Sequence, residues 1–489
     1  MKFIVIGIND NPQPWFPPEV MEIIRQGQVF SGGRRHHEIV MPQLPPNARW
    51  IDITAPLDKV FDEYKDIARQ PPPQPLPVRE GSDMSFPQDS QQVTAPLPHR
   101  EGLGGGAVDS HSIIVFASGD PLFFGFATTI QRRMPEAELV VYPTLNSLQM
   151  LAHRLTMPYH DMRIVSLTGR PWPDFDRALI ERTPKIGVLT DKEHTPSAIA
   201  QRMLEYGYRD YRMHVGEHLG HPGLERVVSL SLEEAAKETF AMPNCIILDP
   251  PPALPCREGE VTSVDKGQGP SRLSSPSLQG RAGGGSPYGL PDTSFALLDG
   301  RAKMITKMPI RLLTLQALDL PRRCTLWDIG ACTGSVSIEA RLLFPHLRIE
   351  AFEVRPECEA IIHENMRRHG APGIGVHIGD FRFVSCDSVA TDATGKQAAS
   401  PDEEGPYGRP DAVFIGGHGG KLKEIMAKVL RYLAPDGVIV MNSVAAPRVS
   451  RNSLRLWNEA CAELHLRQDE PTRIQLDDNH PITILRCKR

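Results

Sequence analysis

A glycine loop with an acid on either side of it is the part of this sequence best suited to chemistry. In residues 325–340 a short apolar run ends at Asp328, Gly330 and Gly334 follow, and a helical apolar pattern begins near residue 336. A strand, a tight turn and a helix in this order bind nucleotide-like ligands, because glycine lets the ligand approach the backbone at the helix start. Glu353 stands about 20 residues further on, the spacing of an acid that binds ribose hydroxyls.

The loop pattern leaves the identity of the nucleotide open. Dehydrogenases favour the spacing G-x-G-x-x-G, whereas this loop places Cys332 midway between Gly330 and Gly334. We interpret Cys332 as a small packing residue rather than a nucleophile.

A second cluster of turn residues lies in the N-terminal half. Gly119, Asp120 and Pro121 follow the apolar run 113–117, and Gly7 ends the first apolar run of the chain. Since Gly-Asp-Pro is also a common turn, these residues alone leave ligand binding and simple chain reversal both open.

Charged side chains near glycines are further candidates. We expect His36, His37 and His418 to lie in loops, and without further ligands at metal spacing we predict no metal site. Arg34 and Arg35 could bind acidic groups of a substrate bidentately or could simply be solvated.

Composition narrows the class of protein. A chain of 489 residues should form two or three domains. The net charge of −5 with interspersed signs argues against a surface that follows nucleic-acid phosphates. Eight cysteines without a C-x-x-C pair indicate reduced thiols in a cytoplasmic protein. We find neither a signal segment nor a run of about 18 apolar residues, so we expect no membrane association.

Short apolar runs alternate with helical patterns in both halves, which predicts α/β layers. We expect one domain over 1–249, a linker over 250–287 and a second domain over 288–489. The linker and an insert at about 71–110 are rich in Pro, Gly, Ser and Gln, and both carry the hexamer L-P-x-R-E-G, at 76–81, 97–102 and 254–259. Such composition cannot bury enough apolar surface to order itself, so we predict two disordered inserts.

The loop at 328–334 resembles motif I of class I S-adenosylmethionine-dependent methyltransferases, and residues 411–417 and 433–440 resemble their fourth strand and the turn into their fifth. Segments 290–292, 305–307, 414–420 and 479–485 further resemble the family that methylates C15 of precorrins. This resemblance implies that Thr306 touches the cofactor, that residues 330–334 wrap its amino-acid end and that Glu353 holds its ribose. It also implies that Gly379 and Asp380 border the adenine and that Phe381 binds the cofactor. Cys332 replaces the usual middle glycine, and we expect its side chain to narrow the approach of the cofactor.

The N-terminal half carries a separate resemblance. Residues 116–125 resemble the S-G-D-P loop of tetrapyrrole methylases, and Gly7 with segments 31–36, 166–170 and 189–196 follow the C5-methylating members in order. This implies a two-lobed, non-Rossmann fold that binds S-adenosylmethionine between its lobes, with Gly7, Gly119, Asp120 and Pro121 at the cofactor. The first loop lacks its second glycine, and we expect Asn9 to take the left-handed conformation there.

Together the two resemblances imply an α/β chain with an N-terminal two-lobed tetrapyrrole methylase fold and a C-terminal Rossmann-like class I methyltransferase fold. They imply one S-adenosylmethionine per domain, a precorrin substrate methylated at C5 and C15, loss of the ring C acetate carboxylate in cobalamin synthesis, and a homo-oligomer. The alternative is an RNA or protein methyltransferase fused to a non-catalytic binding module. Residues 415–418 read Ile-Gly-Gly-His, and not the Asn/Asp-Pro-Pro-aromatic motif of many nucleobase methyltransferases.

Overall fold

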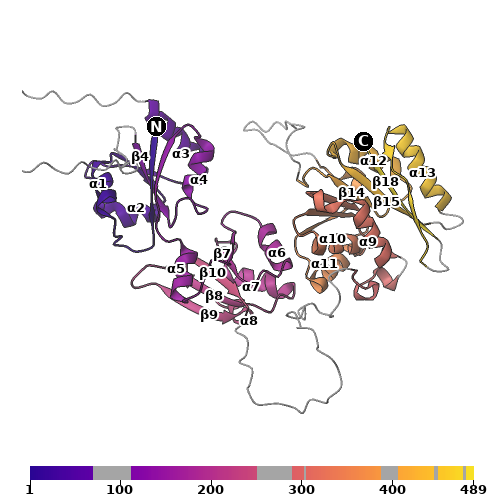
Figure 1. Cartoon of the computed structure of the whole chain (residues 1–489), viewed down its shortest axis with the longest axis horizontal. Coiled ribbons are helices and arrows are strands. Elements are labelled where there is room, and N and C mark those ends of the chain that lie inside the picture. The colour runs from indigo at the N-terminus through magenta and orange to yellow at the C-terminus, as the bar shows by residue number, and fades with distance from the viewer. Residues whose placement is uncertain (70–111, 251–288, 302–303, 387–405, 445–449, 477–480) are drawn as a thin grey trace, which may run out of the picture.

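The computed structural model describes residues 1–69, 112–250, 289–301, 304–386, 406–444, 450–476 and 481–489. The expected disordered inserts at about 71–110 and 250–287, apart from residue 250, lie outside these ranges. The described residues form two lobes in the N-terminal half and one larger sheet domain in the C-terminal half, with lobe 2 between lobe 1 and the C-terminal half (Figure 1).

Lobe 1 is a five-stranded parallel sheet in the order β3-β2-β4-β1-β5. Its core strands read as continuous apolar runs, because helices cover both faces of the sheet. Helices α3 and α4 pack on one face, and α1 and α2 pack on the other. The elements are β1 (Lys2–Ile8), α1 (Pro18–Gln26), β2 (Val29–Gly32), α2 (Arg34–Val40), β3 (Arg49–Asp52), α3 (Asp58–Arg69), β4 (Ser112–Ser118), α4 (Phe126–Arg133) and β5 (Glu138–Tyr142).

Lobe 2 is a mixed sheet in the order β6-β7-β10-β8-β9, in which β10 runs antiparallel to both of its neighbours. Helices α6, α7 and α8 contribute to the core on one face, and α5 packs against β10 on the other. The elements are α5 (Ser147–Arg154), β6 (Arg163–Ser166), α6 (Pro173–Ile180), β7 (Ile186–Leu189), α7 (Pro196–Glu205), β8 (Arg212–Glu217), β9 (Arg226–Ser231), α8 (Leu232–Ala235) and β10 (Asn244–Asp249).

The C-terminal half contains a sheet in the order β13-β12-β11-β14-β15-β18-β16, with β17 paired to β18. Strands β11 to β15 are parallel, and β18 is antiparallel to β15. The elements are α9 (Met308–Ala317), β11 (Thr325–Ile329), α10 (Ser335–Leu343), β12 (Arg348–Glu353), α11 (Glu357–His369), β13 (Ile374–Ile378), β14 (Ala412–Ile415), α12 (Leu422–Tyr432), β15 (Val438–Val444), α13 (Ser450–Glu463), β16 (Arg467–Gln468), β17 (Thr472–Ile474) and β18 (Ile482–Lys488).

Strand β11 has its sequence successor β12 on one side and β14 on the other, so the strand order reverses at this point. Helices α9 to α11 cover one face of the sheet, and α12 and α13 cover the other. Ligands of open α/β sheets bind at such a reversal, outside the carboxyl ends of the strands.

The predicted fold class is confirmed, with a two-lobed N-terminal half and a Rossmann-like C-terminal half. One placement was wrong, since His36 and His37 lie in helix α2 and not in a loop. Within the described ranges, we find no helix with the length and apolar character needed to cross a bilayer.

Lobe 2 and the C-terminal half contact each other directly. The Tyr208 hydroxyl donates a hydrogen bond to the Gly370 carbonyl at 2.7 Å, and Arg367 lies 3.5 Å from Glu205. Tyr206 packs on the C-terminal core, and Leu342 packs on the core of lobe 2. The interface is therefore partly apolar and partly hydrogen-bonded.

Candidate active sites

A cavity of about 380 Å³ lies at the reversal point of the C-terminal sheet. It opens where β11, β12 and β14 end, as expected for a ligand site in this class of sheet. Its lining combines glycines, acids and bases: Ile329, Gly330, Phe352, Glu353, Val354, Arg355, Gly379, Asp380, Phe381, Arg382, Gly417, His418, Gly419, Lys421 and Ile425.

The glycine loop adopts the backbone that its sequence predicts. Gly330 has a φ of +80°, and a Cβ built on it would lie 2.6 Å from the Gly417 nitrogen. Gly334 has a φ of +72° and caps the start of α10. Both positions need glycine, because the left-handed conformation penalises a side chain and because two backbone segments meet at Gly330.

Cys332 packs in the protein interior. Its φ is +52°, and its side chain is buried in the core cluster that also contains Ala331 and Cys358. Cys332 does not line the cavity, and the expectation that its side chain narrows the cofactor approach stays a prediction. Burial raises the pKa of its thiol, which is consistent with a packing role.

Glu353 ends β12 with its carboxylate at the cavity and only 1% of its side chain exposed. The Cys332 N–H donates to Oε2 at 2.8 Å, and the Arg355 side chain donates to both oxygens at 2.9 and 3.1 Å. Burial would raise the pKa of Glu353, but the hydrogen bonds from Arg355 and Cys332 outweigh burial and lower it. The group is therefore an ionised acceptor at neutral pH.

Asp328 lies beneath the loop and is fully buried. Ser337 donates to its Oδ2 at 2.6 Å, whereas its Oδ1 has no hydrogen-bond partner. Burial raises the pKa of Asp328 to about 6. The hydroxyl of Thr333, in the same loop, is also buried without a partner. Two unsatisfied polar atoms beside a glycine loop fit a site completed by a polar ligand.

Asp380 and Phe381 line the far side of the cavity. The Asp380 carboxylate accepts hydrogen bonds from the Arg382 backbone and side chain, which lower its pKa. The Phe381 ring is buried, with the Lys428 ammonium 4.7 Å from its centroid. A flat apolar face beside a carboxylate acceptor fits a purine with an exocyclic amine.

The predicted C-terminal residues fall into two groups. Gly330, Glu353, Asp380 and Phe381 line the cavity, whereas Asp328, Ala331, Cys332, Thr333 and Gly334 lie in or below the loop. Thr306 is not among the lining residues, and its carbonyl accepts a hydrogen bond from Arg311 at 2.7 Å. Gly330 and Glu353 at the cavity fit S-adenosylmethionine, which carries ribose hydroxyls.

A second cavity, of about 470 Å³, lies between the two lobes of the N-terminal half. Lobe 1 contributes the ends of β1 and β4, and lobe 2 contributes residues beside β6, β7 and β8. Its lining includes Asn9, Asp10, Arg35, His36, Ser118, Gly119, Phe124 and Leu145.

The S-G-D-P loop packs tightly on the first strand. A Cβ on Gly7 would lie 2.0 Å from the Gly119 carbonyl oxygen, so only glycine fits there. Gly119 has a φ of +61° and lines the cavity. Asp120 and Pro121 are not among the lining residues, and the Asp120 carboxylate accepts the Leu122 N–H at 2.9 Å.

Asn9 does not take the left-handed conformation expected for it. Its side chain instead accepts the Asn11 N–H at 3.1 Å, as in an Asx turn. The first loop thus turns without a second glycine, and Asn9 lines the cavity.

A hydrogen-bonded cluster joins the two lobes at this cavity. Arg35 donates to Asp10 and to Ser118, each at 2.9 Å, and the Asp10 carboxylate also lies 2.8 Å from His218 of lobe 2. Of the two arginines considered from the sequence, Arg35 therefore belongs to the cavity, while Arg34 points outward with 93% of its side chain exposed.

His36 extends this cluster as a neutral donor. Burial, and then the neighbouring Arg35, lowers the pKa of His36 to about 4. Its Nδ1 accepts the Gly33 N–H at 3.3 Å, so Nε2 carries the proton and donates to Ser118 at 2.9 Å. The Ser118 oxygen then accepts from both Arg35 and His36.

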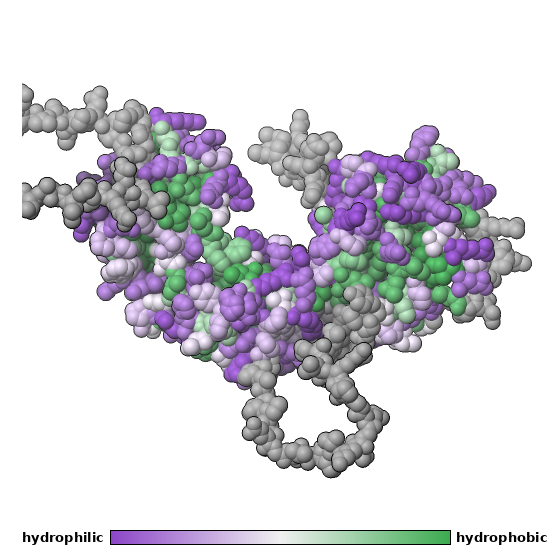
Figure 2. Space-filling model, viewed as in Figure 1, coloured by the Kyte–Doolittle hydropathy of each residue, from purple (hydrophilic) through white to green (hydrophobic). Residues whose placement is uncertain are grey.

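Apolar side chains surround the mouth of the N-terminal cavity. Phe124 and Leu145 line it and remain 46% and 44% exposed, with Leu122 close by in sequence and 47% exposed. In the space-filling view, hydrophobic residues gather where lobe 1 faces lobe 2 (Figure 2). Exposed apolar groups around a cavity are typical of a binding site for a large, partly apolar ligand.

Sequence reasoning missed several bases at the C-terminal cavity, namely Arg355, Arg382 and Lys421. Arg355 and Arg382 each follow a predicted acid by two residues, and this i to i+2 pairing was the available signal. As for metals, the part of the chain that the structure describes contains no group of three or more His, Cys, Asp or Glu that could hold an ion.

Two families match the two halves of the chain. Residues 3–236 match the tetrapyrrole (corrin/porphyrin) methylases, and residues 299–468 match the precorrin methyltransferase domain. The first match covers lobe 1 and lobe 2 as far as α8, and the second covers most of the C-terminal sheet, so each contains most of the residues that line one of the two cavities.

Three curated relatives match most or part of the chain. A precorrin-6Y C(5,15)-methyltransferase [decarboxylating] from Sinorhizobium sp. is 27% identical over 441 residues, which cover 90% of this chain and 84% of that protein. A cobalt-precorrin-6B C(15)-methyltransferase (decarboxylating) from Salmonella typhimurium is 30% identical over 39% of this chain and 93% of that protein. A cobalt-precorrin-7 C(5)-methyltransferase from the same organism is 29% identical over 28% of this chain and 66% of that protein.

Proposed function

Because the chain belongs to the family of precorrin-6Y C(5,15)-methyltransferases (decarboxylating), we propose that it methylates a precorrin at C5 and C15 in cobalamin biosynthesis. The same protein removes carbon dioxide from the acetate side chain of ring C. Both transfers use S-adenosylmethionine, with one cofactor in each half.

The observation that carries the proposal is the presence of two separate cavities, each within the half that matches a methyltransferase family. We assign C5 methylation to residues 1–249 and C15 methylation with decarboxylation to residues 288–489. Two of the relatives are named for methylation at C15 alone and at C5 alone, and each matches only part of this chain.

In the C-terminal half, S-adenosylmethionine would supply a methyl group activated by its sulfonium centre. Gly330 lets the loop after β14 pack against the cofactor loop, and Gly417 leaves open space beside its backbone. Glu353 accepts hydrogen bonds from the ribose, and Phe381 with Asp380 receives the adenine. Asp328 and residues 331–334 shape the loop around the amino-acid end. Transfer from a sulfonium neutralises charge, so alignment and exclusion of water supply much of the acceleration.

The substrate supplies its own nucleophile and its own electron sink. The conjugated, enamine-like carbons of a reduced tetrapyrrole attack the methyl group, and electrons released by loss of carbon dioxide enter the imine system of the macrocycle. The protein has to orient the acetate and exclude water, which requires neither a metal nor a second cofactor.

In the N-terminal half, the cavity suits the same cofactor and the same substrate. Gly7 and Gly119 bring the S-G-D-P loop against the first strand, and Asp120 and Pro121 complete the turn that presents this loop to the cofactor. The exposed rings and aliphatic groups of Phe124 and Leu145 receive the faces of the macrocycle. Arg35, 39% exposed, is the nearest cation for a substrate carboxylate.

The test is incubation of the full chain with precorrin-6B and S-adenosylmethionine, followed by mass spectrometry of the tetrapyrrole. We expect two methyl groups to be gained and one carbon dioxide to be lost. The variant Asp328→Ala should prevent decarboxylation and one methylation while the C5 methyl group is still added. A wild-type chain that leaves the tetrapyrrole mass unchanged would refute the assignment. We also propose a homo-oligomer, which light scattering would measure.

A further inference from the structure

An arm of the chain precedes α9 and packs against the core of the C-terminal half. We call residues 289–301 and 304–307 the strap. The strap leads through two short 3-10 turns, Asp292–Ser294 and Leu298–Gly300, to Thr306 and the start of α9. Leu290, Phe295, Leu298 and Ile305 pack in the core of this half, and a few buried polar side chains add hydrogen bonds.

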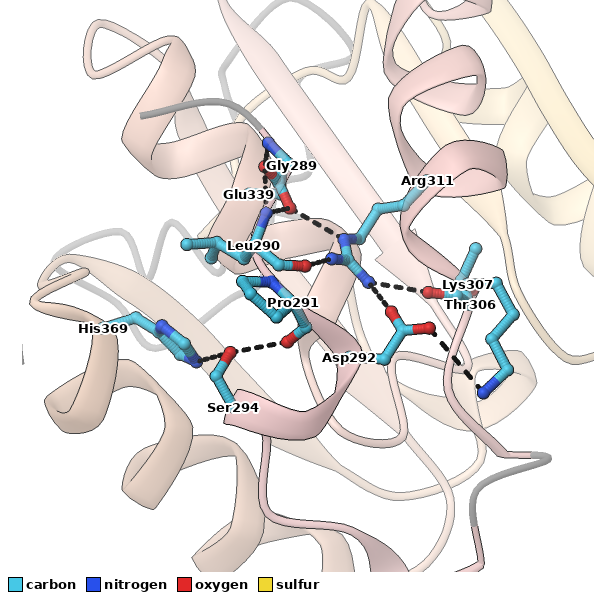
Figure 3. Close-up of polar contacts among 10 residues, drawn as sticks. All are labelled: Gly289, Leu290, Pro291, Asp292, Ser294, Thr306, Lys307, Arg311, Glu339 and His369. Atoms are coloured by element: carbon cyan, nitrogen blue, oxygen red, sulfur yellow. Dashed lines mark hydrogen bonds and ion pairs between the residues drawn. The ribbon is translucent and has the colours of Figure 1, made fainter. Parts of the chain in front are cut away.

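Arg311 of α9 holds both ends of the strap. Its guanidinium is fully buried and donates to Glu339 Oε2 at 2.8 Å, to the Thr306 carbonyl at 2.7 Å and to Asp292 Oδ1 at 3.2 Å, and it also donates to the Leu290 carbonyl (Figure 3). Leu290 and Asp292 lie near the start of the strap, whereas Thr306 lies at its end.

Glu339 of α10 also binds the start of the strap. Its Oε1 accepts the Gly289 N–H at 2.8 Å and the Leu290 N–H at 3.2 Å (Figure 3). The Glu339 side chain is 1% exposed, and a buried carboxylate needs partners for its charge. Arg311 and these two amides are those partners. The ion pair thereby joins α9, α10 and both ends of the strap.

The strap is linked to the cofactor loop and to Glu353 through Asn365, the shared core and Arg355. Asn365 of α11 bonds the Ala296 backbone at 2.7 and 3.0 Å and the Thr333 carbonyl at 3.0 Å. Ile305 packs in the core cluster that contains Ala331 and Cys332. Met304 Sδ lies 3.8 Å from the guanidinium of Arg355, the residue that binds Glu353.

From these contacts we propose that Arg311 is a positioning residue for the C-terminal methyl-transfer site, in which the Arg311–Glu339 pair sets the strap against the cofactor loop. The inference rests on the proposed function and deepens it, because it names a buried residue outside the cavity that fixes the strap beside the loop at the cofactor. Arginine is required, since its planar group donates to four acceptors in fixed directions, and a lysine ammonium has only three donors on a narrower head.

The test is Arg311→Lys in the full chain, with S-adenosylhomocysteine as the probe in titration calorimetry. The wild-type chain should show two sites, and Gly334→Val identifies the C-terminal one by removing it. We expect Arg311→Lys to weaken the C-terminal site at least tenfold and to leave the N-terminal site unchanged. The matched control is Arg322→Lys, an exposed arginine just beyond α9, which should change neither site.

A second readout needs no ligand. Hydrogen exchange at Gly289, Leu290 and Ala296 should accelerate in Arg311→Lys, while the amides of β11 and β14 stay protected. The double variant Arg311→Met/Glu339→Gln removes the buried charges together and should give the same tenfold loss at the C-terminal site. Thr306→Val keeps the carbonyl that Arg311 binds and should leave strap exchange unchanged.

Three results would overturn the positioning role. The first is an unchanged affinity of the C-terminal site for S-adenosylhomocysteine in Arg311→Lys, and the second is unchanged exchange of the strap amides in that variant. The third is loss of protection of the β11 and β14 amides in both Arg311→Lys and the double variant Arg311→Met/Glu339→Gln, which would make Arg311 a folding residue only. Failure of the proposed function has a different signature. The wild-type chain would bind S-adenosylhomocysteine at both sites yet leave precorrin-6B unaltered, and the calorimetric result on Arg311 would still stand.

Discussion

The carboxyl group of Asp328 reduces the stability of the folded protein at neutral pH. Its pKa rises from 3.8 to about 6 on folding, because it is fully buried with one oxygen unpaired. The folded state therefore binds more protons than the unfolded state between these two values. Its contribution to stability is present below pH 4 and is lost as the pH rises through 6, a loss of about 3 kcal/mol.

Asp328→Asn should abolish this dependence, since the amide is nearly isosteric and does not ionise. Without ligand, thermal unfolding of the C-terminal half at pH 7 should shift upward relative to wild type, and the difference should shrink towards pH 4. The control Asp436→Asn, at a side chain that is 87% exposed, should show no such trend. A constant difference across the pH range would contradict the shifted pKa of Asp328.

At the scale of elements, the turn after β11 is the part of the site that sequence predicted best. Gly330 and Gly334 were identifiable because a tight strand-to-helix turn demands positive φ, a requirement that depends on local sequence alone. The Arg311–Glu339 ion pair was not predictable, because the two residues are 28 positions apart and meet only after α9 and α10 pack. The same limit explains why β3 and β9, short strands whose partners are set by the whole sheet, were not predicted.

Gly330→Ala and Gly419→Ala separate the free-energy cost of backbone strain from that of a steric clash. Gly330 lies in the turn after β11, and Gly419 lies in the loop after β14. Both glycines have positive φ, but a Cβ on Gly419 meets nothing within 4 Å, whereas one on Gly330 lies 2.6 Å from the Gly417 nitrogen. Gly419→Ala should cost about 1 kcal/mol of backbone strain, and Gly330→Ala should cost at least twice as much because the β14 loop must move.

Hydrogen exchange of the β11 amides, which reports the free energy of opening, measures both costs. Equal values for Gly330→Ala and Gly419→Ala would show that the contact between the two loops is loose.

At the scale of the whole molecule, the contact between lobe 2 and the C-terminal half makes the two active halves a single unit. Asp176 of α6 is fully buried and accepts two hydrogen bonds from Arg202, each at 2.7 Å. A Cβ on Gly373 of the C-terminal half would lie 2.8 Å from Asp176 Oδ2, so the two halves approach closely at this carboxylate. Tyr208 closes the same interface through Gly370.

We therefore expect the halves to stay together after the linker is cut. A protease site placed within 251–288 allows the cut, and size-exclusion chromatography at micromolar concentration measures the association. Tyr208→Phe removes the hydrogen bond to Gly370 and should weaken association roughly fivefold, as for a loss of about 1 kcal/mol. Tyr211→Phe, whose hydroxyl bonds Thr183 within lobe 2 at 2.9 Å, should have no effect on association. Separate elution of the wild-type halves would contradict the interface.

The parallel direction of the strands in lobe 1 also has a practical consequence for handling the protein. Strand β4 runs for seven residues from Ser112 to Ser118, about 20 Å at roughly 3.3 Å per residue. Residues 70–111 join the sheet at its Ser112 end, and the cavity lies at its Ser118 end. A purification tag or a fluorescent label inserted near residue 90 would thus be attached at the edge of lobe 1 opposite the cavity, which makes this position a suitable internal handle for immobilising an active enzyme.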